Sequence, residues 1–271
     1  MERIGVGASG LSRTVLKSPA EIGIMDDANR IIRKILADLG GLVRPDVSTA
    51  ELDAFAEARI REAGGVPAFK GYPHRHDGRD FPATICASVN DEVVHGIPRP
   101  DVRLRDGDIV SVDLGIQYRG YYGDAAWTFA VGEVAPEAGR LLEVTREALR
   151  RAIDQVRPGG RISDIGHAVQ SWVEDQGFSV VREFVGHGIG SSLHEEPQVP
   201  NFGPPGKGVR LHPGMVLAIE PMVNAGGAGV LLSADDGWTA RTQDGSLSAH
   251  FEVSVAVTER GAMVLGDPLA P

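Results

Sequence analysis

Residues 108–131 read DIVSVDLGIQYRGYYGDAAWTFAV, which is two runs rich in Val, Ile and aromatic residues. The runs predict a β-hairpin that turns near Tyr118 and Arg119. Asp113 and Asp124 are equally far from that turn, so an unbulged hairpin would place them directly opposite each other. Like charges in that position destabilise a sheet, and the apolar neighbours indicate burial. We expect either a protonated aspartate or a cation between the carboxylates; aspartates that only end strands are the alternative.

Two glutamates repeat this pattern later in the chain. Glu220 and Glu252 each adjoin a run of apolar residues, where a glutamate is rarely buried unless it is paired. His187 stands among glycines after a predicted strand, a setting that by itself is more typical of a turn. Together, four carboxylates and one imidazole form an oxygen-rich ligand set, typical of Co, Mn, Fe or Zn in a two-metal site. Four negative charges would balance two divalent ions, and such a pair favours metal-assisted hydrolysis.

The composition excludes several classes of protein. The chain has 271 residues, of which 42% are hydrophobic and 24% charged, as in ordinary globular proteins. The net charge of −10 makes nucleic acids and membranes poor partners. We find no run of about 18 apolar residues and no secretory signal. A single cysteine, Cys86, cannot form an intramolecular disulfide, so we expect a cytoplasmic location.

The order of elements predicts an α+β fold. We expect helices over residues 18–40, 49–63, 136–156 and 163–177, with Ser163 as the cap of the last. We expect strands over residues 83–89, 108–116, 121–131, 179–185, 215–223 and 249–258. Helices and strands recur at an offset of 113 residues, which indicates two similar halves; two independent helical hairpins with common caps are the alternative. Residues 18–271 would form one domain with antiparallel sheets covered by helices, after an N-terminal arm over residues 1–17.

With these features, the chain resembles a known family, the bacterial-type (type I) methionine aminopeptidases. The blocks that carry the resemblance are ICASVNDEVVHGIP (85–98), GDIVSVDLG (107–115), GDAAWTF (123–129), VGHGIG (185–190), LHEEPQV (193–199), AIEPMV (218–223), DGWTARTQDGSLSAHFE (236–252) and VAVT (255–258). The resemblance implies the pita-bread fold of creatinase and the aminopeptidases, with two pseudo-symmetric halves. It also implies a metalloaminopeptidase that removes the N-terminal methionine from nascent proteins and peptides when the second residue is small.

The resemblance implies five metal ligands: Asp113, Asp124, His187, Glu220 and Glu252. Asp113 would bind one of two divalent ions, and His187 with Glu220 would bind the other. Asp124 and Glu252 would bridge both ions. A metal-bridging hydroxide would then attack the carbonyl carbon of the methionine residue.

Catalytic and substrate-binding roles are implied for further residues. Glu220 would be the general base, His194 would stabilise the oxyanion, and His95 would contact the substrate amide. An apolar pocket for the methionine side chain would be lined by Tyr72, Phe81, Cys86 and Trp238. We interpret Cys86 as a small buried apolar residue and not as a nucleophile.

The pocket departs from the family pattern in three places. Phe81 replaces a common tyrosine, and Leu193 stands where an aromatic residue often precedes the histidine. Residues 74–80 form a short polar insertion at the expected pocket mouth. The five histidines without a comparable setting are interpreted as surface or structural residues: His74, His76, His167, His212 and His250.

Other functions remain alternatives. The runner-up enzyme is a pita-bread peptidase that cleaves next to proline, such as an Xaa-Pro aminopeptidase or dipeptidase. A non-enzymatic pita-bread binding protein would usually lose metal ligands, and an acidic structural scaffold would bind no divalent ion. His187 and Glu220 are only 33 positions apart, which leaves no room for the insertion of type II enzymes. The resemblance further implies a monomer that acts on methionyl peptides and nascent chains near the ribosome.

Overall fold

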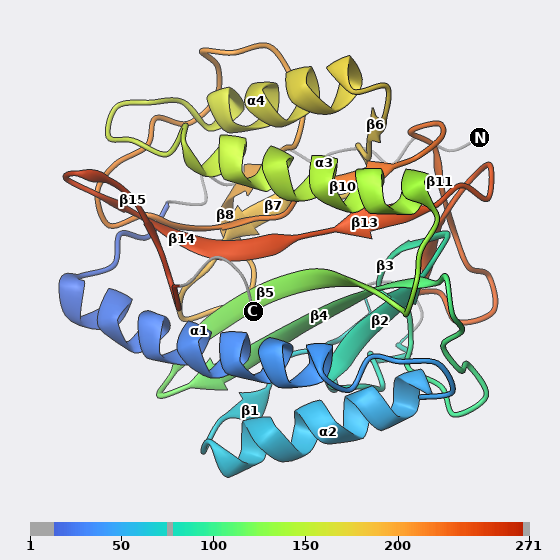
Figure 1. The fold of residues 1–271 in the computed structure, drawn as a ribbon. Helices are drawn as coiled ribbons and strands as arrows, with labels where there is room; N and C mark the ends of the chain where they lie inside the picture. The colour runs from blue at the N-terminus through green and yellow to red at the C-terminus, as the bar shows by residue number, and fades with distance from the viewer. Residues whose placement is uncertain (1–13, 75–77, 268–271) are drawn as a thin grey trace.

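The computed structural model describes residues 14–74 and 78–267, and Figure 1 shows the arrangement of the elements. The helices are α1 (Pro19–Gly40), α2 (Thr49–Glu62), α3 (Pro136–Ile153) and α4 (Ile162–Asp175). The strands are β1 (Val66–Pro67), β2 (Ile85–Val89), β3 (Glu92–Val94), β4 (Ile109–Tyr118), β5 (Tyr121–Ala130), β6 (Ser179–Val180), β7 (Gly186–Gly188), β8 (Glu195–Val199), β9 (Val216–Ile219), β10 (Met222–Asn224), β11 (Val230–Leu232), β12 (Ala240–Thr242), β13 (Ser248–His250), β14 (Glu252–Thr258) and β15 (Gly261–Val264). Among the described residues, no helix is long and apolar enough to cross a membrane.

An antiparallel sheet of nine strands forms the centre of the molecule. Its main order is β1-β4-β5-β14-β9-β7-β8, with β2 also paired to β4 and β15 to β14. Two smaller sheets have the orders β13-β10-β6 and β11-β12-β3. In Figure 1, α1 and α2 lie against the strands of the first half, and α3 and α4 lie against those of the second half. The prediction of an α+β fold with antiparallel sheets covered by helices is therefore confirmed.

The two halves repeat each other at the predicted offset. Helix α4 and strand β6 begin and end 113 residues after α2 and β1. Glu51 of α2 accepts a hydrogen bond from the N–H of Ser48, and Asp164 of α4 accepts one from the N–H of Arg161. In each of these two helices, an acidic side chain of the first turn therefore caps the N-terminus by accepting the hydrogen bond of the N-cap N–H. The N-cap of α4 is Arg161, so the prediction of Ser163 in that role is wrong, because Ser163 instead binds the backbone of Lys207.

The β4–β5 hairpin turns one residue later than predicted. Arg119 and Gly120 occupy the turn with φ of 50° and 84°, the positive values that a tight two-residue hairpin turn requires. Asp113 therefore pairs with Ala126, and Asp124 pairs with Gly115. The expectation that the two aspartates lie directly opposite each other is wrong by two residues. Because side chains alternate with a period of two, this shift still leaves both carboxylates on one face.

Three expected strands are shorter or interrupted. The strand expected over 179–185 ends at Val180, before β7 begins in the large sheet. The one expected over 215–223 breaks at Pro221, which has no N–H to donate to a ladder. The one expected over 249–258 breaks at Phe251. At the last two breaks the chain passes between the large sheet and the sheet β13-β10-β6, and Glu220 and Glu252 lie beside those crossing points.

Alternate residues of β4 and β5 separate the core from the opposite face. Val112 and Leu114 on β4, with Ala125 and Trp127 on β5, belong to the hydrophobic core that includes α1 and α2. The intervening residues of these strands point to the other face of the sheet. That face carries the cavity described next.

Candidate metal centre and substrate cavity

A cavity of about 500 Å³ lies on the face of the sheet opposite the helices. Every site residue predicted from the sequence lines it: Tyr72, Phe81, Cys86, His95, Asp113, Asp124, His187, His194, Glu220, Trp238 and Glu252. These residues come from segments across both halves of the chain. Phe69 and Phe184 also line the cavity, and the sequence analysis did not select them. Their only signal is their proximity in sequence to other pocket residues.

Strand register brings the acidic residues into one row. Asp113 on β4 pairs with Ala126 on β5, which pairs in turn with Glu252 on β14. Glu220 directly follows Ile219, the partner of Val253, so it comes opposite Glu252 just beyond the ladder. Asp124 lies two residues from Ala126 on the same face. Four carboxylates are thus gathered on four adjacent strands.

Within the part of the chain that the structure describes, three of the four carboxylates each have one buried oxygen without a hydrogen-bond partner. Asp113 Oδ1, Asp124 Oδ1 and Glu252 Oε1 have no partner among the described residues. Burial raises the pKa of Asp113 and of Glu220 to about 7. Burial, together with the neighbouring carboxylates, raises the pKa of Asp124 and Glu252 well above the ordinary range. Unpartnered buried oxygens are costly, so this donor set fits a cationic group that would bind them.

His187 is oriented to offer a free nitrogen to the same group. Its Nδ1 donates a hydrogen bond to the carbonyl oxygen of Gly188 at 2.9 Å, which leaves the Nε2 lone pair available. Nε2 lies 3.8 Å from Asp124 Oδ2 and 3.7 Å from Glu220 Oε1. Ligand atoms of Asp124, His187 and Glu252 lie within 4.8 Å of one another. This spacing suits coordination of a shared ion by several side chains.

His250 is a neighbour of the centre that the sequence analysis placed elsewhere. Its side chain is buried, and its Nε2 lies 3.5 Å from Glu220 Oε2. His250 is therefore a buried residue, so of the two interpretations, surface or structural, the structure excludes the surface one. Its position two residues before Glu252 was an available signal, because residues at that spacing face the same side of an extended strand.

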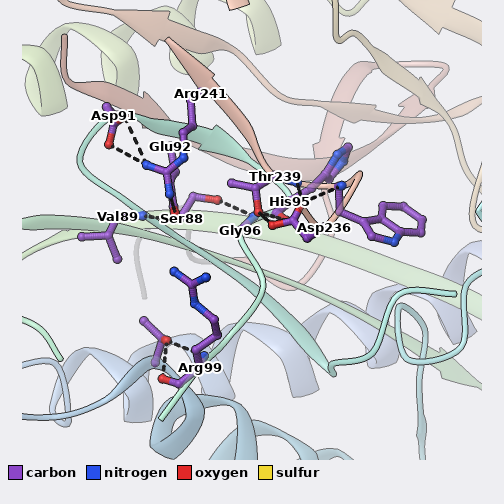
Figure 2. A network of polar contacts seen from close by, with 12 residues as sticks. Ser88, Val89, Asp91, Glu92, His95, Gly96, Arg99, Asp236, Thr239 and Arg241 are labelled. Carbon is purple, nitrogen blue, oxygen red and sulfur yellow. Dashed lines mark hydrogen bonds and ion pairs between the residues drawn. The ribbon is translucent and has the colours of Figure 1, made fainter. Parts of the chain in front are cut away.

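His95 is held in a backbone conformation that non-glycine residues seldom adopt. Its φ is +60°, and the following N–H, of Gly96, donates to Ser88 Oγ at 3.1 Å. Figure 2 shows His95 beside Thr239, whose hydroxyl donates to Asp236 Oδ2 at 2.7 Å. Burial lowers the pKa of His95 to about 4, so its imidazole is neutral near pH 7. A neutral imidazole can donate one hydrogen bond without carrying charge.

His194 lies between His187, a candidate metal ligand, and Tyr72, a residue of the predicted methionine pocket. Its ring centroid is 4.3 Å from that of His187, and its Nδ1 lies 2.7 Å from the hydroxyl of Tyr72. A hydroxyl that donates to Nδ1 leaves the proton on Nε2, so Tyr72 can select the tautomer of His194.

The other wall of the cavity is apolar. Trp238 meets Phe81 edge to face, with ring centroids 5.3 Å apart. Cys86 pairs with Asp113 on the adjacent strand and is buried. Burial raises the pKa of its thiol, with the nearby carboxylates adding to the effect, so the thiol is a weak nucleophile. This environment agrees with Cys86 as a small apolar residue.

The described residues of the predicted insertion, 74 and 78–80, border this wall. The indole N–H of Trp238 donates to the carbonyl oxygen of Arg79 at 2.8 Å. Arg79 in turn donates to the carbonyl oxygen of Asp235 at 2.9 Å. Residues 75–77, including His76, lie outside the described residues. Arg79 therefore joins the segment before Phe81 to the loop of Asp235 and Trp238 at the edge of the cavity.

Comparison with known proteins identifies the family. The model of metallopeptidase family M24 matches residues 23–259. The chain belongs to metallopeptidase family M24. Methionine aminopeptidase 1 of Bacillus subtilis is 51% identical over 251 residues, which cover 93% of this chain and 98% of the relative. Methionine aminopeptidase of Clostridium acetobutylicum is 47% identical with the same coverage. The resemblance read from the sequence motifs is thus confirmed.

Two solved structures have folds similar to that of this chain. Methionine aminopeptidase from Thermotoga maritima has a TM-score of 0.90 and 43% identity, and the match covers 94% of this chain and all of that one. Prolidase from Pyrococcus furiosus has a TM-score of 0.74 at 22% identity, and the match covers only 66% of it. The prolidase likeness shows the shared pita-bread fold alone. The proline-specific alternative is not favoured, because the relatives at about 50% identity are methionine aminopeptidases.

Proposed function

We propose that this chain is an aminopeptidase that removes the N-terminal methionine from nascent proteins and peptides with a small second residue. The observation that carries the proposal is the meeting of unpartnered buried carboxylates and an apolar pocket in one cavity. The relatives named methionine aminopeptidase support the same substrate class. A binding protein that had lost its ligands would not retain all five side chains.

Two divalent ions, of Co, Mn, Fe or Zn, would be held by Asp113, Asp124, His187, Glu220 and Glu252. Strands β5 and β14, which carry Asp124 and Glu252, lie between β4 and β9, so these two carboxylates would serve both ions. Asp113 would hold one ion, and His187 with Glu220 would hold the other. Four carboxylates carry about four negative charges, which two divalent ions balance. Divalent ions in such a site activate water and polarise a carbonyl.

Three side chains of this chain would then act on the substrate. Glu220 accepts the proton from the attacking water as the general base. His194, with its proton on Nε2 opposite Tyr72, donates to the oxygen on which negative charge develops. His95, neutral because of its burial, donates to the substrate amide and orients it.

Specificity for methionine would come from the apolar wall. Tyr72, Phe81, Cys86 and Trp238 line the cavity and would surround the methionine side chain of the substrate. A pocket of this kind discriminates by burial of apolar surface.

The broader context of the proposal follows from the fold and the composition. One hydrophobic core includes helices from both halves, which supports residues 18–271 as a single catalytic domain after an arm over residues 1–17. Residues 1–13 of that arm lie outside the described residues. We further propose that the protein is a cytoplasmic monomer whose partners are methionyl peptides and nascent chains near the ribosome. Neither nucleic acid nor membrane is a proposed partner.

A peptide panel tests the proposal. Met-Ala, Met-Gly, Met-Leu and Xaa-Pro peptides would be incubated with the purified chain and Co, Mn, Fe or Zn, with and without a chelator. We expect methionine release from the first two peptides, little from the others, and none after chelation. Preferential cleavage of Xaa-Pro bonds, or release that a chelator leaves unchanged, would contradict the proposal.

A further inference from the structure

Lys17 is a buried lysine that the site described above does not use. Only 3% of its side chain is exposed, and lysines are seldom buried unless they are paired. Its Nζ lies 2.5 Å from Glu195 Oε2 and donates to the carbonyl oxygen of Val15 at 3.0 Å. Its backbone N–H donates to the carbonyl oxygen of Gly214. The residue just before the N-cap of α1 is therefore fixed to the second half of the molecule.

Glu195, the partner of Lys17, belongs to the loop that carries His194. Glu195 begins β8 and pairs with Gly188, the residue after His187. Its Oε1 accepts a hydrogen bond from the N–H of Ser192 at 3.2 Å, so one carboxylate spans the segment 192–195. Glu195 also lines the cavity, whereas Lys17 does not. Lys17 therefore reaches the cavity indirectly, and Glu195 is the cavity residue with which it forms an ion pair.

The ion pair packs directly on the backbone of this loop. A Cβ atom at Gly190 would lie 2.3 Å from Cε of Lys17 and 2.5 Å from Oε1 of Glu195. The carbonyl oxygen of Gly190 accepts a hydrogen bond from the N–H of Tyr122 on β5, the strand that also bears Asp124. Residues 189–195, which we call the His194 loop, are thus held between β5 and the Lys17–Glu195 pair.

We propose that Lys17 is a positioning residue that acts through Glu195 to fix the His194 loop, and so couples the segment before α1 to the catalytic cavity. The inference rests on the proposed function of His194 in methionine removal. A buried ion pair adds little net stability over apolar packing, but loss of one partner leaves an uncompensated charge. The pair therefore contributes mainly to the geometry of the loop. A small displacement of a catalytic group is enough to slow turnover greatly.

The test compares Lys17→Met, Glu195→Gln and the double variant in the metal-loaded protein. Lys34→Met is the matched control, because Lys34 forms an exposed ion pair with Asp38 on α1. The measurements are kcat and KM for a Met-Ala peptide, bound metal, and amide hydrogen exchange of the His194 loop. We expect each single variant to lower kcat about 10- to 100-fold while KM and metal content change less than about twofold. Exchange in the loop should become faster in both variants and remain unchanged in the control.

The double variant separates positioning from independent roles. Removal of both charges leaves no unpaired ion, so its loss of kcat should not exceed that of the worse single variant. Losses that multiply in the double variant would overturn the inference. Unchanged loop exchange in Lys17→Met, or a fall in kcat that follows loss of metal, would also overturn it. An inactive wild-type protein would refute the proposed function instead, and the exchange measurement would still decide whether the pair fixes the loop.

Discussion

The buried carboxylates of the cavity differ from ordinary aspartates and glutamates in how strongly they hold protons. The cause is tertiary: burial places Asp113, Asp124, Glu220 and Glu252 together without hydrogen-bond partners for several of their oxygens. Two predictions at the scale of single residues follow from their shared environment.

Loss of a single carboxylate ligand should abolish turnover. We expect Asp113→Ala and Glu252→Ala each to reduce the rate of methionine release by more than about 100-fold. Loss of a residue that only supports a metal ligand already costs up to roughly 100-fold. Bound metal, measured by elemental analysis, should fall in parallel. Asp235→Asn, on the exposed loop near Trp238, is the control and should retain both. Full turnover of either alanine variant at saturating metal would exclude the proposed site.

The metal-free protein should become less stable as the pH rises from about 4 to about 7. Burial raises the pKa of Asp113 to about 7 in the folded state, above its value of about 3.8 in the unfolded chain. A raised folded-state pKa stabilises the fold fully at low pH, and this contribution disappears as the group ionises near pH 7. Urea unfolding of the wild type and of Asp113→Asn at several pH values, both without metal, measures this contribution of Asp113 to stability. Between about pH 4 and about pH 7, the fall in the free energy of unfolding should be smaller in the variant than in the wild type, by at most about 4 kcal/mol. An equal dependence of the free energy of unfolding on pH in both proteins would contradict the raised pKa of Asp113.

At the scale of elements, the β4–β5 hairpin determines where the first two carboxylates lie. The turn residues Arg119 and Gly120 both have positive φ, and a turn one residue earlier would have changed the register by two. Glycine tolerates this backbone conformation, whereas residues with a Cβ atom do so at a cost.

Substitution of the turn glycine should therefore destabilise the protein. We expect Gly120→Ala to lower the free energy of unfolding by about 1–2 kcal/mol. Gly139→Ala is the contrasting variant, because Gly139 lies inside α3 with open space around it. It should raise the free energy of unfolding by about 1 kcal/mol, since alanine is the better helix former. Urea denaturation measures the free energy of unfolding of both variants. If both substitutions changed it equally and with the same sign, backbone conformation would not be the cause of the change.

At the scale of the whole molecule, the two halves contribute to one centre. Asp113 and Asp124 come from the first half, and His187, Glu220 and Glu252 come from the second. The halves are joined there by the pairing of β5 with β14 (Figure 1). An ion held by ligands from both halves would bind the folded chain and not the unfolded one.

Metal should consequently stabilise the entire fold. A ligand at 100 times its dissociation constant adds about 2.7 kcal/mol to the free energy of unfolding. For a chain of this size, that corresponds to a rise in the unfolding midpoint of roughly 5–10 °C. Differential scanning fluorimetry with Mn or Co, followed by chelation, should show a reversible shift. The variant Glu252→Ala is expected to show little shift, and a shift equal to that of the wild type would place the ion elsewhere.

Much of the local structure was predictable because its causes are local. The capping residue Ser18 and the terminal Gly40 mark the bounds of α1, and the apolar periodicity fills its buried face. The chemical types of the ligands also limited the chemistry, because carboxylates within apolar strands need a counter-charge. The motifs around His187 and Glu252 then indicated the family, which the comparisons confirmed.

Tertiary structure alone decided the register of the aspartates and the pairing of Lys17 with Glu195. Lys17 and Glu195 are 178 positions apart, and nothing near either residue reveals the other. Side-chain period and capping depend on neighbours within a few positions, so they can be read along the chain. Contacts across strands and loops depend on how the whole chain packs, and a change of one residue in a turn shifts every pair that follows it.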